Sequence, residues 1–169
     1  MASHGTEEKL VREVLLDKDL LPQSGLDSLL DPDPLREENP KAHATERRCK
    51  AVVINNFDKR GITNITLRHR YRNDPNRGQQ RTYDRLGFGE ITSLPLDVIY
   101  FTGPGTGRDY WFVEFLDSAG QRWQCKPNFY CILRTEDEGT TVQSVLNGST
   151  EEMSLIIVSG NCRVSLSKQ

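Results

Sequence analysis

The residues best suited to covalent chemistry in this chain are its four cysteines and three histidines. A cysteine thiolate beside a histidine base can act as a nucleophile, and Cys125 or Cys131 could meet His69 in the folded chain. No local pattern around these residues supports such a pair, and no arrangement of paired carboxylates stands out for acid–base catalysis. We therefore expect no catalytic residues and a protein that is not an enzyme.

Metal and cofactor sites are also weakly supported. No pair of cysteines has Cys-x-x-Cys spacing and the histidines are scattered, which disfavours zinc. The acidic turn Glu136-Asp137-Glu138 lacks the alternating ligand spacing of a calcium loop. The glycine-rich residues 103–107 could cradle phosphate if a helix followed, but the sequence after them predicts a strand. We expect no metal, no cofactor, and a flexible loop between two strands at residues 103–107.

An arginine-rich segment is the clearest candidate for ligand contact. Guanidinium groups match phosphate oxygens, so the segment could bind lipid headgroups or RNA. Alternation along residues 65–71 instead places Ile65, Leu67, His69 and Tyr71 inward and the arginines in water, which favours an ordinary solvated sheet face. The basic residues are Arg68, Arg70, Arg72, Arg77, Arg81 and Arg85, with His69, Tyr71 and Tyr83 between them.

Charge and composition divide the chain into an acidic extension, residues 1–48, and a body, residues 49–169. The extension holds eleven Asp/Glu and seven Lys/Arg, and the body thirteen and fifteen. A net charge of +2 on the body is too small to indicate a nucleic-acid partner. In the extension, apolar spacing predicts one short helix over residues 6–21, and the prolines and charges that follow predict a mostly disordered linker.

The expected cellular location follows from two kinds of segment that the sequence lacks, a transmembrane helix and a secretion signal. No run approaches the roughly 20 apolar residues of a transmembrane helix, and the N-terminus has no basic start followed by an apolar stretch typical of a secretion signal. We therefore expect a soluble, cytoplasmic protein. Four cysteines are sparse for 169 residues, so reduced thiols are favoured over disulfides.

The pattern of apolar and turn residues in the body is typical of an all-β domain. Short apolar or alternating runs are separated by turn residues at the spacing typical of a sandwich, and no long helix is indicated. The expected strands are residues 49–55, 65–71, 86–91, 94–102, 110–116, 122–125, 140–146, 153–159 and 162–166. Residues 128–134 leave helix and strand undecided.

Three motifs carry a resemblance to a known family. These are Arg68-His69-Arg70-Tyr71, the run from Thr102-Gly103 through Thr106-Gly107-Arg108-Asp109-Tyr110-Trp111-Phe112-Val113, and Asp117-Ser118-Ala119-Gly120. In this order they resemble the proteins first described as up-regulated in nematode insulin-receptor mutants, an offshoot of the aegerolysin superfamily that is also present in fungi. The resemblance covers roughly residues 50–166.

The resemblance implies a jelly-roll-like antiparallel β-sandwich and a possible homodimer. Aegerolysins proper recognise sphingolipid-bearing membranes and can form pores with a partner protein. Residues 107–111 match the family's strongest motif, and a structural role for them is favoured over ligand contact. The candidate binding residues are Arg68, Arg70, Gly107, Arg108, Asp109, Tyr110 and Trp111.

These observations favour a non-enzymatic binding module that engages a membrane lipid headgroup or a protein partner through its loops. The alternative is a soluble homodimeric structural or stress-abundant protein without a small-molecule ligand. Lipid binding predicts exposed aromatic side chains clustered at one end of the fold, whereas a dimer predicts a flat apolar sheet face.

Overall fold

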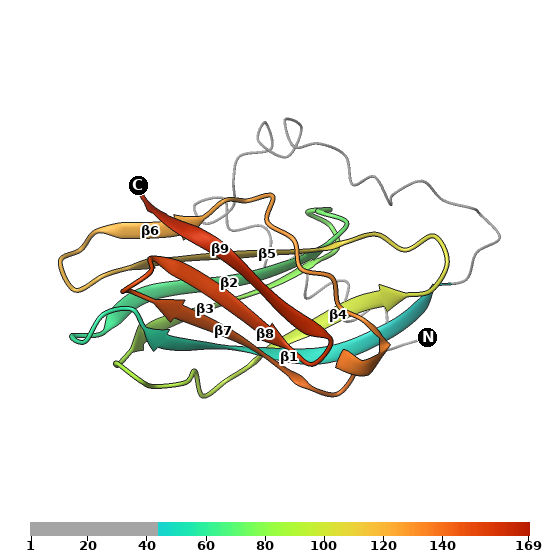
Figure 1. Ribbon diagram of the computed structural model, residues 1–169, viewed down its shortest axis with the longest axis horizontal. Helices are drawn as coiled ribbons and strands as arrows, with labels where there is room; N and C mark the ends of the chain where they lie inside the picture. The colour runs from blue at the N-terminus through green and yellow to red at the C-terminus, as the bar shows by residue number, and fades with distance from the viewer. Residues whose placement is uncertain (1–43) are drawn as a thin grey trace.

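The computed structural model describes residues 44–169, which form an all-β domain (Figure 1). The all-β prediction is confirmed, and within this range the one helical element is the short 3₁₀ turn η1, Thr135–Asp137. The helix predicted over residues 6–21 and the linker after it lie outside the described residues. Among residues 44–169, no helix has the length and apolar character needed to cross a bilayer.

Nine strands make up one sheet in the order β3-β2-β5-β6-β9-β8-β7-β1-β4. Their bounds are β1 Thr45–Asn56, β2 Ile62–Tyr71, β3 Gly78–Leu86, β4 Leu96–Thr102, β5 Asp109–Leu116, β6 Arg122–Cys125, β7 Thr141–Asn147, β8 Glu152–Ile157 and β9 Gly160–Lys168. All neighbours are antiparallel except β1 and β7, which pair in parallel from Lys50↔Thr141 to Asn56↔Asn147. The expected wholly antiparallel pairing is therefore wrong at this one position.

The sheet curls until its two edge strands, β3 and β4, lie near each other. Gln79 on β3 accepts a hydrogen bond at Oε1 from the backbone N–H of Ile99 on β4, at 3.2 Å. The Tyr83 hydroxyl donates to the carbonyl of Leu94 at 2.6 Å. Because an edge strand otherwise presents unpaired backbone groups, these side-chain bonds help to close the sheet into a nearly complete barrel.

The core fills the inside of this curled sheet. β1, β4, β7 and β8 bury alternate residues there, such as Ala51, Val98, Val142 and Leu155, as their sequences predict. β5 is different, because Asp109 through Phe115 are buried on both parities. This confirms the prediction of a central strand covered on both faces.

The structure corrects one predicted strand and decides the segment that the sequence left undecided between helix and strand. Residues 78–86 form β3, whereas residues 87–95 form an irregular β3–β4 loop rather than the strand expected over 86–91. Residues 128–134 form an extended segment that contacts the start of β5 through a Tyr110↔Tyr130 bridge. Hydrogen bonding to a neighbouring strand decides both cases, and a single-sequence pattern does not contain that information.

Candidate binding surfaces

His69 and Asp109 form a hydrogen-bonded pair inside the sheet. His69 Nε2 lies 2.8 Å from Asp109 Oδ1, and His69 Nδ1 lies 2.8 Å from Gln79 Oε1. Gln79 Oε1 also accepts the backbone N–H of Ile99, and an amide oxygen can only accept hydrogen bonds. His69 Nδ1 therefore carries a proton and donates it to Gln79 Oε1. The hydrogen bond between His69 Nε2 and Asp109 Oδ1 holds one further proton, which the two groups share.

The surroundings of Asp109 indicate a structural role. Its second oxygen, Oδ2, accepts the backbone N–H of Leu133 at 2.8 Å, and the side chain is almost completely buried. Burial raises the pKa of Asp109, opposed by its hydrogen bond to His69. Through Asp109, the pair holds residues 129–133 beside β5. Both side chains are buried, so a substrate cannot reach them from solvent.

The motif over residues 107–111 is split between the two sides of β5. Trp111 is buried in the core, where its Nε1 donates to the carbonyl of Cys131 at 3.1 Å. The backbone N–H of Gly107 donates to the Tyr71 hydroxyl at 2.8 Å. Gly107, Asp109 and Trp111 therefore hold the fold together, whereas Arg108 and Tyr110 face the other side.

Neither Cys125 nor Cys131 forms the reactive cysteine–histidine pair with His69 that the sequence analysis considered. Cys131 is joined to Cys162 in a disulfide, so the expectation of reduced thiols is wrong for this pair. Cys49 and Cys125 are free and buried, and desolvation raises the pKa of Cys49 to about 12 and that of Cys125 to about 11. Such thiols remain protonated and unreactive. A disulfide is typical of oxidising compartments, and this bond counts against the cytoplasmic prediction.

Arg68 and Arg70 are not exposed to water, and the predicted solvated face is wrong. Their side chains are 2% and 1% exposed, on the side of β2 opposite to His69 and Leu67. Thr66 is buried on the same side. Alternation correctly separated the two sides of the strand, but it could not show that both sides are covered.

We call this surface the arginine face. Strand register places Arg68 beside Phe112 and Arg70 beside Tyr110 on adjacent strands. The Arg68 guanidinium lies 4.7 Å from the centre of the Phe112 ring, and that of Arg108 lies 4.2 Å from the Tyr130 ring. The face consists of Thr66, Arg68, Arg70, Gln80, Arg108, Tyr110, Phe112, Glu114 and Tyr130.

The other arginines of the basic segment are spread over the surface. Arg72 donates from Nη2 to the carbonyl of Gly105 at 2.6 Å and so fastens the glycine-rich loop, which joins β4 to β5 as predicted. Arg77 and Arg85 are exposed, and Arg81 is half-buried on β3. The structure therefore gathers Arg68, Arg70 and Arg108, but does not bring the whole segment to one site.

The β3–β4 loop exposes three large apolar side chains that the sequence reasoning missed. Phe88, Ile91 and Leu94 are 48%, 56% and 61% exposed. Apolar residues in an alternating run resemble a strand, which is why this segment was predicted as one. A possible signal was Gly87-Phe88-Gly89, since glycines on both sides of an aromatic residue are unfavourable in a strand.

Hydrogen bonds to β1 hold this loop in place. Gly89 N–H donates to the carbonyl of Asn55 at 2.7 Å, Thr92 N–H donates to the carbonyl of Val53 at 3.0 Å, and Val53 N–H donates to Thr92 Oγ1 at 3.0 Å. The exposed side chains are thus presented by an anchored backbone. Lys59, Arg60 and Arg85 are exposed close by, in and beside the turn that leads into β2.

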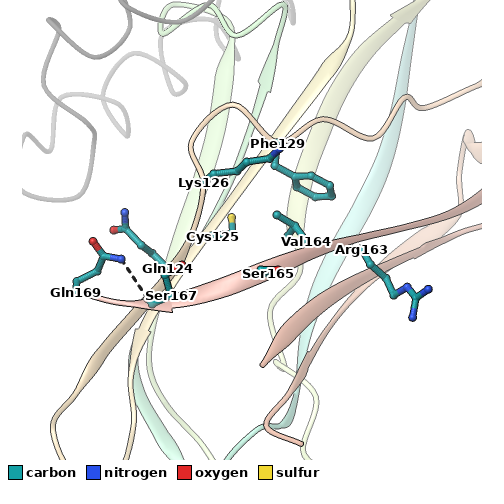
Figure 2. Close-up of a pocket in the computed structure, with 9 residues that line it drawn as sticks. All are labelled: Gln124, Cys125, Lys126, Phe129, Arg163, Val164, Ser165, Ser167 and Gln169. Carbon is teal, nitrogen blue, oxygen red and sulfur yellow. Dashed lines mark hydrogen bonds between the residues drawn. The ribbon is translucent and has the colours of Figure 1, made fainter. Parts of the chain in front are cut away.

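A cavity of about 440 Å³ lies between β6, β9 and the segment after β6. Figure 2 shows Cys125 and Val164 among its lining residues, with Lys126 and Phe129 on the opposite side from β9 and Arg163 pointing away. Serines and glutamines supply most of its polar groups, and Gln169 donates to the carbonyl of Ser167 at 3.1 Å. Nothing in this cavity pairs a nucleophile with a base.

Asp137, from the acidic turn, is a structural carboxylate. It accepts from Arg134 N–H at 2.7 Å, from Ser159 N–H at 2.9 Å and from the Ser159 hydroxyl at 2.5 Å. Among residues 44–169 no cluster of three or more His, Cys, Asp or Glu side chains is arranged to hold a metal ion.

Comparison with known proteins does not assign the chain to a family. No family model matches the chain, and no curated protein matches it. The aegerolysin-like resemblance remains a prediction from the motifs.

Proposed function

We propose that this protein is a non-enzymatic binding module whose β3–β4 loop attaches to the headgroup region of a lipid membrane. The observation that carries the proposal is the exposure of Phe88, Ile91 and Leu94 together on one anchored loop. The proposal includes the jelly-roll-like fold relationship to the aegerolysin superfamily that the sequence motifs imply.

The chemistry of the loop suits a membrane interface. Apolar side chains gain free energy on leaving water, and a loop already fixed by hydrogen bonds loses little conformational entropy when it inserts. The exposed side chains of Lys59, Arg60 and Arg85 can contact lipid phosphates beside the inserted residues. Carboxylates of Asp84 and Glu90 are also exposed here, so we expect attraction by anionic lipid to be modest.

The size of the effect follows from the exposed area. Complete burial of a large apolar side chain contributes about 1.5–3 kcal/mol, and these three are about half exposed, so their insertion contributes about 3 kcal/mol in total. This corresponds to roughly a 100-fold change in the partition coefficient. The triple variant F88S/I91S/L94S should therefore release most of the protein from vesicles.

The matched control changes exposed apolar residues elsewhere. Ile156 and Val158 are also exposed, at the end of β8 and just beyond it, and have no part in the proposed loop contact. The variant I156S/V158S should sediment with vesicles like the unaltered protein. Equal loss of binding in both variants would reject the loop as the contact surface.

Insertion can be observed directly with a reporter in the loop. Trp111 and Trp123 are buried and are poor reporters of lipid contact, so we would use Phe88→Trp. Its fluorescence should shift to the blue when vesicles are added. If no vesicle composition changes the emission or sediments the protein, the membrane proposal fails; a dimer in ultracentrifugation would then favour the homodimeric, ligand-free alternative.

A further inference from the structure

The cavity between β6 and β9 occupies a gap in the sheet. Pairing of these two strands ends at Cys125↔Leu166, and the Cys131–Cys162 disulfide joins the two segments again. Between these connections lie five residues on the β6 side and three on the β9 side. The longer segment bows away from β9, and the cavity of about 440 Å³ lies in the space between them (Figure 2).

Backbone hydrogen bonds hold the longer segment, residues 126–130, in place. A β-turn with Pro127 at its second position is closed by the N–H of Phe129, which donates to the carbonyl of Lys126 at 3.3 Å. The Trp111 N–H on β5 donates to the carbonyl of Phe129 at 3.0 Å. This wall of the cavity is therefore formed before any ligand binds, which lowers the entropic cost of binding.

The floor of the cavity is apolar and uncharged. Cys125, Phe129 and Val164 are 1%, 6% and 7% exposed. The Cys125 sulfur accepts the backbone N–H of Val113 at 3.4 Å, and burial raises the pKa of this thiol to about 11, so it carries no charge at neutral pH. These three side chains provide a surface on which an apolar group can pack.

The charged side chains at the rim are cations. Lys126 and Arg163 are exposed there, and the described residues that line the cavity include no aspartate or glutamate. Glu114 lies beside Gln124 on the neighbouring strand, but its Oε2 is 3.8 Å from Nη1 of Arg122, at the opposite end of β6 from Lys126. The rim therefore favours a negatively charged group over a positively charged one.

Hydroxyl and amide groups beside the cations can donate hydrogen bonds to an anion. Ser165 and Ser167 are exposed on the same side of β9 as Arg163, and Gln124 is paired with Ser167 across the two strands. Lys126 belongs to the same β-turn as Phe129, whereas Figure 2 shows the Arg163 side chain pointing away from the cavity. Lys126 is therefore the direct contact for an anion, and Arg163 adds to the positive potential of the rim.

We propose that this cavity binds a small organic anion. The apolar body of the ligand packs on Cys125, Phe129 and Val164, and its carboxylate or phosphate group lies beside Lys126. A volume of about 440 Å³ falls within the roughly 300–1,000 Å³ typical of small-molecule sites. This site is separate from the β3–β4 loop, and the proposal does not depend on membrane binding.

NMR titration of the isotope-labelled full chain tests the proposal. The probes are benzoate and phenyl phosphate, which carry a carboxylate and a phosphate on the same apolar ring. Either probe should shift the amide peaks of Phe129, Val164 and Ser165 until the site is saturated, and the tighter of the two identifies the preferred anionic group. Benzyl alcohol has the ring without the charge, and acetate has the charge without the ring. Each should bind about tenfold more weakly, because each lacks one of the two contacts.

Substitutions at exposed positions locate the bound probe. K126Q/R163Q removes both rim cations and should weaken binding of the better probe about tenfold. The matched control K50Q/R77Q removes two exposed cations that do not line the cavity, and should bind like the unaltered protein. Ser165→Trp places a bulky ring at the rim and should abolish binding, and the exposed position of Ser165 allows the domain to fold.

Four outcomes would overturn the proposal. Absence of amide shifts with both anionic probes up to about 10 mM excludes even millimolar affinity. Equal affinity for benzyl alcohol or acetate means that the cavity does not recognise an anion on an apolar body. Equal binding by K126Q/R163Q and K50Q/R77Q means that the rim cations do not hold the ligand. Binding that persists in Ser165→Trp, with a folded amide spectrum, places the probe outside the cavity.

Discussion

The structural interpretation of Asp109 leads to a quantitative prediction. Replacing it with alanine removes the hydrogen-bond partner of two buried groups, the backbone N–H of Leu133 and His69 Nε2, each 2.8 Å from a carboxylate oxygen. Leaving a buried polar group unsatisfied costs about 1–3 kcal/mol. We therefore expect Asp109→Ala to lower the free energy of unfolding by about 4 kcal/mol, a large part of the 5–15 kcal/mol typical of a domain.

Asp109→Asn is the matched control. Its side-chain oxygen can still accept from Leu133 N–H, and its amide can donate to His69 Nε2, because His69 already carries a proton on Nδ1 toward Gln79. We expect this variant to lose about 1 kcal/mol. The measurement is urea unfolding followed by tryptophan fluorescence, since the Trp111 ring lies 4.8 Å from that of His69.

The result that would refute this reasoning is specific. If Asp109→Ala unfolds at the same urea concentration as the unaltered protein, the two hydrogen bonds do not stabilise the fold. If that variant also loses vesicle binding, Asp109 belongs to a ligand site. A stability loss with vesicle binding intact under native conditions supports the structural role.

Four further predictions concern stability and reactivity. Reduction of Cys131–Cys162, or the variant C131A/C162A, should destabilise the protein by about 4 kcal/mol, since the bond closes a loop with a sequence separation of 31; equal urea midpoints with and without reductant in the unaltered protein would contradict this. Because burial raises the pKa of Asp109, the native state keeps that proton to higher pH than the unfolded chain. Stability should therefore fall as pH rises from about 3.8 through the raised value, and this fall should be absent in Asp109→Asn. Gly148→Ala places a Cβ 2.0 Å from the Phe57 carbonyl oxygen and should be more destabilising in urea than Gly120→Ala, which meets no atom within 4 Å but has a φ of +79°. Cys49 and Cys125 should resist iodoacetamide in the native protein, measured by intact mass, and react after unfolding in urea.

The sequence by itself determined the class of fold and most of the strands. Alternation along β1, β7 and β8, and the doubly apolar run in β5, follow from side chains pointing to opposite faces of a strand, which is a local property. The turn after Leu116 was visible for the same reason, since Asp117 Oδ1 accepts the backbone N–H groups of Ala119 and Gln121. The structural role favoured for residues 107–111 agrees with the contacts of Gly107, Asp109 and Trp111.

Only the tertiary structure decided what covers each strand and which distant residues meet. Arg68 and Arg70 alternate correctly with Leu67 and His69, but whether the second face of β2 meets water depends on the rest of the chain. The Cys131–Cys162 bond, the parallel pairing of β1 with β7 and the attachment of the β3–β4 loop to β1 all join residues far apart in sequence. Their energies depend on packing and hydrogen bonding between elements, and no local pattern of residues records which elements become neighbours.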